Sequence, residues 1–437
     1  MLCLRTARRL PSQALHHRFS SPITRLSSST VAEPDPIAYH WINGVEALAS
    51  YQPGGYHPIM IGDTLNNRYR IVDKLGSGGY ATVWLARDNN LATYVALKVC
   101  TADAHPRETR VLRALCASEP ARDFLPALHD EYKIQGPNGT HLCYTVTLAQ
   151  CDLREISYSR LFPLDAARGL CYGVAQAVAA VHSEGYVHGD IHLNNILARL
   201  PSKAYHLSIE ELYEKFGDPE TVAVTHVDGK PLPPNVPSEA VKPLFLGKYA
   251  EKFLISDARP LLSDFGEAFA PESETRLGRD SCTPAAFRAP EARFEPDAPL
   301  SYPADIWSLA TAVWDVMGMK EEVVANWVDV LGPFPSDWWA RWEGRGKYFT
   351  EHGKPTEWYE KNKWEPLEEA FDTCLQIHRR RWGGEICEEE RVAFLSMIRQ
   401  MLVYRPEERL SAEQVMESEW MVKWAYPDYK RSFEDPR

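Results

Sequence analysis

An aspartate and an asparagine stand five residues apart in the polar stretch "YVHGDIHLNNILARL". The carboxylate of Asp190 can accept or orient the proton of an attacking hydroxyl group. The amide oxygen of Asn195 is a hard ligand of the kind that magnesium prefers. His192 lies between them and is a third candidate for the same chemistry. The spacing predicts phosphoryl transfer to a hydroxyl group, with Asn195 on the metal.

A glycine-rich segment, "LGSGGYATVWLA", precedes this loop in the chain. Gly76 and Gly78 take the first two positions of a G-x-G-x-x-G pattern and Ala81 takes the third, so backbone amides can approach phosphate oxygens closely. The pattern alone leaves an ordinary hairpin turn open. The predicted nucleotide-binding residues are Leu75, Gly76, Ser77, Gly78, Gly79, Ala81, Val83, Ala96, Lys98 and Glu108.

Three further residues complete a phosphoryl-transfer set in chain order. Lys98 in "VALK" follows Val83 by fifteen residues, where an ammonium group can reach the α- and β-phosphates. Glu108 is the carboxylate expected to hold that lysine, although a solvated helix face is the alternative. Asp264 in "PLLSDFGEAF" follows an apolar run and is the second expected magnesium ligand.

Later motifs distinguish between classes of kinase. "FRAPEARF" contains Glu291, "ADIWSLA" contains Asp305 and Trp307, and "YRPEERLSAEQ" contains Arg409. This arrangement resembles the lower lobe of eukaryotic protein kinases. The resemblance implies that Glu291 pairs with Arg409 and that Asp305 braces the catalytic loop. A buried pair of this kind is costly to leave half-made.

The chain resembles the serine/arginine-protein kinase family in particular. The likeness rests on "GGYHPIMIGDTLNNRYRIVDKLGSGGYATVWLARD", on a long insertion after the catalytic loop, and on "VDVLGPFPSDWWARWEGRGKYF". It implies an α+β, bilobal protein kinase fold, with a small antiparallel sheet and one main helix in the first lobe and a mostly helical second lobe. It also implies ATP and Mg²⁺ as cofactors and transfer to serine or threonine, with Arg/Ser-rich basic proteins as substrates.

The chain departs from the common kinase pattern at two positions. Gly189 stands where many kinases carry an arginine that receives an activation-loop phosphate, which favours constitutive activity. His192 stands where protein kinases usually carry a lysine, and a mostly neutral imidazole raises the question of weakened transfer. Ser281 and Thr283 lie near the expected activation loop, but their spacing from Glu291 is unusual and assigns them no role.

These departures leave two alternatives open. "HGDIHLNN" also resembles the H-G-D-x-H-x-x-N loop of aminoglycoside and choline phosphotransferases, so a small-molecule kinase is one alternative. A pseudokinase that binds a nucleotide or a partner is the other. Glu291, Asp305, Trp307 and Arg409 favour a protein substrate.

Apolar periodicity predicts the elements that position these residues. Four segments, "YRIVDKLG", "TVWLARD", "YVALKVC" and "HLCYTVTLA", are typical of strands in one antiparallel sheet, and "PRETRVLRAL" of a helix between them. From about residue 152 the pattern becomes helical. The expected segments are an arm at 1–30, an irregular lead-in at 31–67, a sheet lobe at 68–150, a helical lobe at 151–425 with a partly ordered insertion at about 201–255, and a tail at 426–437.

Composition narrows the partners and the compartment. The chain has 437 residues and a formal net charge of −12, which suits a basic protein partner rather than nucleic acid or an anionic membrane. A monomer is expected. The first thirty residues contain five arginines, six serines and no acid, as in a mitochondrial transit peptide, although a disordered tail has the same composition. The family resemblance instead implies cytoplasm and nucleus.

Three other features favour structural rather than functional interpretations. The nine cysteines form no CxxC pair and are expected to be reduced and mostly buried. The tryptophan-rich segment "DWWARWEGRGKYFTEHGKPTEW" is either a docking surface or a packed subdomain, and packing is favoured. "RRRWGG", residues 379–384, is expected to be solvated surface charge.

Overall fold

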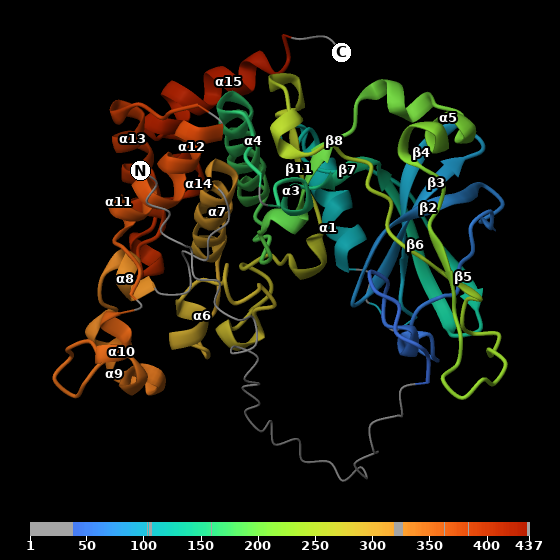
Figure 1. The fold of residues 1–437 in the computed structure, drawn as a ribbon, viewed down its shortest axis with the longest axis horizontal. Coiled ribbons are helices and arrows are strands. Elements are labelled where there is room, and N and C mark those ends of the chain that lie inside the picture. The colour runs from blue at the N-terminus through green and yellow to red at the C-terminus, as the bar shows by residue number, and fades with distance from the viewer. Residues whose placement is uncertain are drawn as a thin grey trace, which may run out of the picture.

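The computed structural model describes residues 38–434, apart from residues 103, 105, 106, 159, 319–326, 362 and 383. The arm predicted at 1–30 lies outside these residues. Figure 1 shows two lobes side by side, a sheet lobe that carries β2 to β6 and a larger helical lobe that carries α4, α7 and α11 to α15. The α+β, two-lobed architecture expected from the sequence is confirmed.

The first lobe is a six-stranded antiparallel sheet with the order β1-β2-β3-β4-β6-β5. Its central strands are buried for most of their length, because apolar residues on both faces of the sheet pack into clusters. The strands are β1 (Thr64–Leu65), β2 (Tyr69–Gly78), β3 (Ala81–Asp88), β4 (Thr93–Cys100), β5 (Leu128–Gly136) and β6 (Gly139–Thr147). Two of these six, β1 and β5, were not predicted. Strand β1 has only two residues and lies in the predicted irregular lead-in. Strand β5 is an edge strand rich in charged and polar residues, so it shows little apolar signal.

Helix α1 (Arg107–Cys116) is the main helix of this lobe and is followed by the short α2 (Glu119–Arg122). Val111, Leu112 and Leu115 are buried at three- and four-residue spacing, which fixes the face that α1 turns to the core. Glu108, in the first turn of α1, lies on the side of the helix that faces β4. The prediction of one helix in this region is confirmed.

The second lobe is built around two buried helices, α4 (Leu164–Ser183) and α7 (Tyr302–Met317). A three-stranded sheet with the order β11-β8-β7 lies at the junction with the first lobe. Its strands are β7 (Ala149–Asp152), β8 (Ile196–Arg199) and β11 (Pro260–Leu262). The remaining helices are α3 (Leu153–Ile156), α6 (Glu291–Phe294), α8 (Trp327–Leu331), α9 (Ser336–Arg341), α10 (Glu357–Glu360), α11 (Leu367–Ala370), α12 (Ile377–Trp382), α13 (Glu388–Met401), α14 (Ala412–Glu417) and α15 (Tyr426–Arg431).

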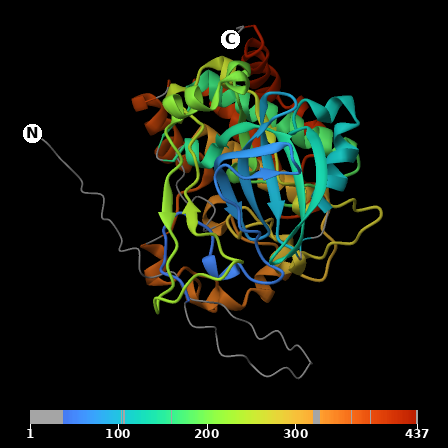
Figure 2. The same cartoon turned by 90° about the vertical axis from the view of Figure 1, so that its right-hand side faces the viewer.

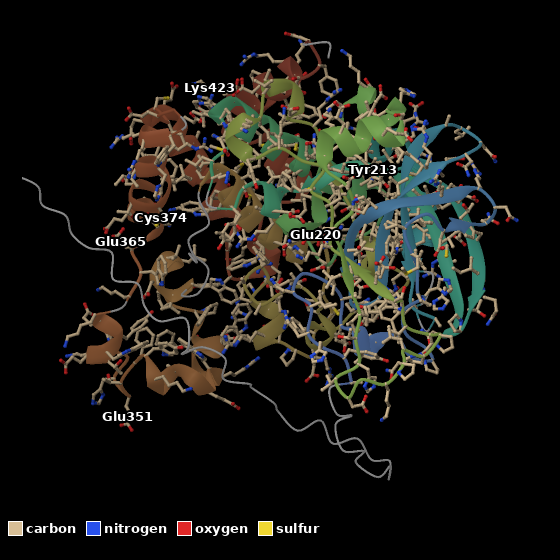
Figure 3. All side chains as sticks on the ribbon, turned by 45° about the vertical axis from the view of Figure 1, so that its right-hand side comes forward. Tyr213, Glu220, Glu351, Glu365, Cys374 and Lys423 are labelled. Carbon is tan, nitrogen blue, oxygen red and sulfur yellow. The ribbon has the colours of Figure 1, made fainter. Side chains whose placement is uncertain are left out.

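The insertion at 201–255 is folded and lies against the sheet lobe. Its position in the chain had led to the prediction that it belongs to the helical lobe. It contains α5 (Ile209–Phe216) and the hairpin of β9 (Thr221–Ala223) and β10 (Glu239–Val241). Leu212 and Leu246 pack with Val72 and Leu85 of the sheet, and these apolar contacts order a segment whose proline and charge content predicted partial order. Figure 2 shows the insertion beside the sheet, and Figure 3 places Tyr213 and Glu220 there.

The segments flanking the two lobes are also packed. Tyr51 and Tyr56 of the predicted irregular lead-in are buried in a small apolar cluster with the insertion. The predicted tail begins with α15, which packs on α4: the rings of Tyr172 and Tyr429 lie 4.9 Å apart. Arg168 on α4 also pairs with Asp428 at 3.3 Å. Residues 426–434 are therefore an integral part of the helical lobe.

Two surface expectations have different outcomes. Trp338 in the tryptophan-rich segment is fully buried, and its ring stacks on Phe294 at 5.2 Å, as a packed subdomain requires. Arg379 contradicts the expectation of solvated charge. Its guanidinium is buried and donates hydrogen bonds to the backbone carbonyls of Met317 at 2.8 Å and Phe162 at 2.6 Å, so it ties three helical-lobe segments together.

The described cysteines form no disulfide. Four of them are buried, whereas Cys282 and Cys387 are exposed, so the expectation of burial holds only in part. Among the described residues, no helix combines the length and the apolar character needed to cross a bilayer.

A buried carboxylate in β2 leads to a prediction about stability. Asp73 is almost inaccessible to solvent, and burial raises its pKa to about 6. The folded protein therefore binds more protons than the unfolded chain between about pH 4 and 6, and stability falls as pH rises through that window. We expect Asp73→Asn to gain about 1–3 kcal/mol relative to the wild type between pH 4.5 and pH 7.5. Chemical denaturation at both pH values measures this; parallel pH profiles would contradict it.

Candidate active site

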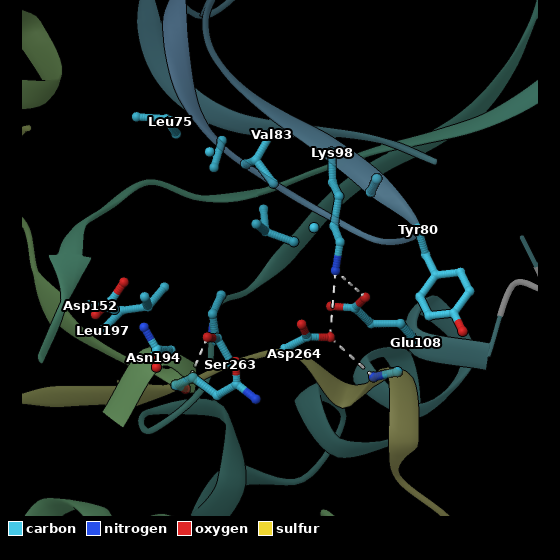
Figure 4. A pocket seen from close by; sticks show the side chains of 18 of the residues that line it. Leu75, Tyr80, Val83, Lys98, Glu108, Asp152, Asn194, Leu197, Ser263 and Asp264 are labelled. Atoms are coloured by element: carbon cyan, nitrogen blue, oxygen red, sulfur yellow. Dashed lines mark hydrogen bonds and ion pairs between the residues drawn. The ribbon is translucent and has the colours of Figure 1, made fainter. Parts of the chain in front are cut away.

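A cavity of about 760 Å³ lies between the two lobes. All ten residues predicted to bind the nucleotide line it, and so do the predicted metal ligands Asn195 and Asp264. Figure 4 shows Leu75 and Val83 on the sheet side and Asp264 and Asn194 on the side of the helical lobe. Residues from three strands, one helix and two loops thus converge on one space large enough for a nucleotide.

Lys98 occupies the centre of the polar part of the cavity. Its Nζ atom lies 2.6 Å from the Oε2 atom of Glu108 and 3.6 Å from the Oδ1 atom of Asp264. Strand β4 supplies Lys98 and helix α1 supplies Glu108, so their contact fixes the position of the helix against the sheet (Figure 4). The alternative of Glu108 on a solvated helix face is not what the structure shows.

The charges of this cluster are set by mutual proximity. Burial opposes the charged form of Lys98, but the carboxylates of Glu108 and Asp264 outweigh it and raise the pKa of the lysine. The ammonium group of Lys98 in turn lowers the pKa of Asp264, against the opposing effect of burial. At neutral pH the cavity therefore presents a cation that can pair with phosphate oxygens and a carboxylate that can hold a metal ion.

The backbone at Asp264 is held in an unusual conformation. Its φ of 62° lies in the left-handed region, which non-glycine residues seldom adopt and which is enriched at functional sites. The following residue, Phe265, is fully buried and packs edge-on against the ring of His188 at 4.8 Å. This anchor turns the Asp264 carboxylate toward Lys98.

The catalytic-loop candidates form one hydrogen-bonded group. The side-chain amide of Asn195 donates to the backbone oxygen of Asp190 at 2.8 Å and to its Oδ2 atom at 3.0 Å. The imidazole Nε2 of His192 lies 3.4 Å from the Oδ1 atom of Asp190. The ring of His192 also stacks on Phe287 at 5.6 Å. Asp190 and His192 lie just beyond the residues that line the cavity, where an acceptor would approach the nucleotide.

The buried carboxylate of Asp305 holds the backbone of the catalytic loop in place. Its carboxylate accepts hydrogen bonds from the backbone N–H of His188 at 2.7 Å and of Gly189 at 2.9 Å, and it contacts His182 at 2.9 Å. Burial favours protonation, but the hydrogen bond with His182 and the surrounding donors lower the pKa of Asp305. A negative charge buried under the loop therefore holds it by charge-assisted hydrogen bonds.

Two more contacts tie the activation segment, residues 264–291, to the helical lobe. Glu291 and Arg409 form a buried bidentate pair with N···O distances of 2.7 and 2.6 Å. Thr283, for which the sequence suggested no role, is buried and donates its hydroxyl to the backbone oxygen of Gly189 at 2.6 Å. Both contacts hold the C-terminal part of the segment.

The oxygen ligands fit a magnesium ion. Because the Asn195 amide nitrogen makes the contacts to Asp190, its amide oxygen faces away, and no described residue donates a hydrogen bond to it. The half-exposed Asp264 carboxylate projects into the same cavity. One amide oxygen and one carboxylate are the ligand types that Mg²⁺ takes alongside water and phosphate oxygens.

Several residues of the site were not predicted from the sequence. The hydroxyl of Tyr144 donates to Glu108, and Leu244 and Leu246 of the insertion line the cavity. The apolar residues around Tyr144 predicted a strand and no functional role. No motif near Leu244 marks that residue as part of a site. The alternation of β6 places Tyr144 on the same face as Lys98, its partner across the sheet, which is the one signal that pointed to it.

The two-lobed fold with this cavity between its lobes is similar to that of a kinase domain. The crystal structure of a kinase domain, which is 17% identical in sequence, superposes with a TM-score of 0.56 over 84% of this chain and 98% of its own. The chain is also 25% identical to a serine/threonine protein kinase of Aspergillus fumigatus over 86% of its length and 90% of the relative's. Human SRSF protein kinase 3 is 34% identical over 160 residues, which cover 34% of this chain and 28% of that protein. No protein-family model matches the chain.

Proposed function

We propose that this chain is an ATP- and Mg²⁺-dependent serine/threonine protein kinase. The observation that carries the proposal is that four residues line one interlobe cavity and Asp190 lies beside them. Each contacts at least one other member of the set, whose lining residues are Lys98, Glu108, Asp264 and Asn195. The similarity of the chain to a serine/threonine protein kinase over most of its length supports the same activity. The intact set of charged residues argues against a pseudokinase.

In the proposed reaction, a substrate hydroxyl oxygen forms a bond to the γ-phosphorus while the bond from that phosphorus to the β,γ-bridging oxygen breaks. The hydroxyl proton passes to Asp190, whose Oδ2 atom is held by Asn195, and ADP leaves. Lys98 binds and orients the phosphates with its ammonium group. Asn195 and Asp264 would hold a magnesium ion, which would supply positive charge to offset the charge of the phosphates. Most of the acceleration comes from this electrostatic positioning.

His192 takes a positioning role in this proposal. Its imidazole touches the catalytic carboxylate of Asp190 and lies 3.3 Å from the amide of Asn195. Stacking on Phe287 fixes the plane of the ring. A histidine in this place therefore holds the carboxylate in orientation, and the cationic role of the usual lysine falls to Lys98 and the metal.

A basic Arg/Ser-rich segment is the proposed substrate. The support is the acidic balance of the chain, 60 acidic against 48 basic residues, together with the partial likeness to SRSF protein kinase 3. We expect faster phosphorylation of an Arg-Ser repeat peptide than of a matched peptide in which every arginine is glutamate. Initial rates on the two peptides with the same serine count measure this preference. Equal rates would contradict the substrate class and leave the kinase activity intact.

Activity independent of activation-loop phosphorylation is also proposed. Glu274 of the activation segment pairs with Arg107 of helix α1 at 2.7 Å, and Glu267 pairs with Arg276 at 2.6 Å. The first pair holds the segment near α1, and the second links two parts of the segment to each other, both without an added phosphate. Phosphatase-treated protein is expected to keep its rate, and a lost rate that returns on rephosphorylation would contradict this.

For localisation we propose mitochondrial import through the basic N-terminal arm, with cytoplasm and nucleus as the alternative. The support is the acid-free, arginine- and serine-rich composition of residues 1–30. A fluorescent fusion of residues 1–40 is expected to co-localise with a mitochondrial marker. Diffuse cytosolic fluorescence would sink the import proposal.

A further inference from the structure

We propose that Tyr56 is a positioning residue that holds the glycine-rich loop, residues 75–81, over the nucleotide. This rests on the proposed function, because it assigns a task within the ATP site. The hydroxyl of Tyr56 donates a hydrogen bond of 2.7 Å to the backbone oxygen of Gly78, at the tip of the β2–β3 hairpin. Tyr56 itself does not line the cavity and belongs to a segment, residues 38–56, that we call the N-terminal brace.

The glycine-rich loop has little packing of its own. A Cβ atom added at Gly76, Gly78 or Gly79 would meet no other atom within 4 Å, so these positions lie in open space. Glycine also has the largest conformational freedom to lose when its backbone becomes ordered. An outside contact is therefore needed to keep such a loop in one position, and the bond from Tyr56 is one that reaches its tip.

The bond also orients a peptide group. In a trans peptide, the C=O of one residue and the N–H of the next point in opposite directions. With the Gly78 carbonyl turned toward Tyr56, the N–H of Gly79 points to the other side of the loop. Gly78 and Gly79 both line the cavity, where a backbone N–H can bind a phosphate oxygen.

The brace is anchored firmly enough to act on the loop. Glu46 pairs with Lys74 of β2, and both side chains are almost completely buried. The hydroxyl of Tyr51 donates to the same Glu46 carboxylate, and the rings of Tyr51 and Tyr56 lie 5.5 Å apart. Lys74 lies four residues before Gly78 on the same strand. Its buried ion pair with Glu46 therefore fixes the segment that carries Tyr56 near the loop.

Hydrogen bonds to backbone carbonyls of the brace hold it from other sides. The side-chain amide of Asn138, in the β5–β6 turn, donates to the backbone oxygen of Tyr56 at 2.7 Å. The N–H of Ala102, just after β4, donates to Gly55 at 3.1 Å. Asn235 of the insertion donates to Tyr51 at 2.8 Å. The brace therefore connects the loop tip to three separate parts of the sheet lobe.

The test is Tyr56→Phe, with Tyr213→Phe as the matched control. Each change removes one tyrosine hydroxyl that donates to a backbone carbonyl of β2, at Gly78 for Tyr56 and at Val72, 2.9 Å away, for Tyr213. Tyr213 lies in α5, and its bond is remote from the loop tip. Calorimetric binding of a non-hydrolysable ATP analogue with Mg²⁺ and steady-state kinetics are measured on the full chain.

We expect Tyr56→Phe to raise the dissociation constant of the ATP analogue and the KM for ATP about threefold to tenfold, the effect of one lost hydrogen bond. The KM for the peptide is expected to stay unchanged, and Tyr213→Phe to bind like the wild type. Amide hydrogen exchange at residues 76–81 is expected to speed up only in Tyr56→Phe.

Two results would overturn the inference. One is wild-type affinity for the analogue in Tyr56→Phe, and the other is an equal loss in Tyr213→Phe, which would reveal a general effect on the sheet. A wild-type chain that binds no analogue would instead overturn the proposed function, so the two failures are distinguishable.

Discussion

Replacement of Asp190 by asparagine is expected to reduce kcat for peptide phosphorylation by about 10²- to 10⁴-fold, because the substrate hydroxyl loses its proton acceptor. The change keeps the size of the side chain. Since Asp190 lies beyond the residues that line the cavity, the dissociation constant for MgATP is expected to stay within about twofold of the wild type. Quench-flow or steady-state rates and calorimetry measure the two quantities separately.

The matched control for this change is Asp228→Asn, at an exposed carboxylate in the insertion that pairs with Lys230. It removes one negative charge far from the reaction and is expected to leave both quantities unchanged. A wild-type kcat in Asp190→Asn would remove Asp190 from its assigned role. A large loss of ATP affinity would mean that the carboxylate acts on the nucleotide instead.

The second large effect is expected at Arg409, whose guanidinium is inaccessible and pairs with Glu291 through two hydrogen bonds. It also donates to the backbone oxygens of Val403 at 2.7 Å and Tyr404 at 2.9 Å. Arg409→Ala leaves the buried Glu291 charge without its partner, so we expect a loss of about 3–5 kcal/mol in the free energy of unfolding.

Lys423→Ala is the control for Arg409→Ala. Lys423 pairs with Glu389 on the exposed surface, where Figure 3 places it at the rim of the helical lobe. Solvent screens such a pair, so no measurable change is expected. Denaturant unfolding compares the two variants, and equal stabilities would show that the Glu291–Arg409 pair is not a structural anchor. A double variant, Glu291→Gln with Arg409→Ala, is expected to recover part of the loss.

The chemistry of the site was readable from the sequence because its residues belong to short motifs in a fixed order. Lys98 and Glu108 lie on neighbouring elements, and the structure brings them within 2.6 Å of each other. Asp190 and Asn195 lie in one loop, so their contact follows from local geometry. The apolar periodicity of α4 and of the central strands predicted those elements for a comparably local reason.

The unpredicted parts depend on contacts between distant segments. The strand β5 alternates half-buried with exposed, largely charged residues, so its apolar signal is weak. The insertion looked partly ordered because prolines and charges outnumber its apolar residues locally, yet Leu212 and Leu246 reach the sheet. Arg379 looked like surface charge because nothing in "RRRWGG" reveals the carbonyls of Met317 and Phe162 that surround it.

The central claim is that this chain transfers phosphate from ATP to a protein hydroxyl with a histidine at position 192. The most direct measurement is transfer of labelled γ-phosphate, with Mg²⁺, from ATP to an Arg-Ser peptide, choline and an aminoglycoside in parallel, beside the Asp190→Asn variant. We predict phosphoserine on the peptide, no labelled small molecule, and loss of the label in the variant. Labelled choline or aminoglycoside with an unlabelled peptide, or ATP binding without any transfer, would contradict the claim.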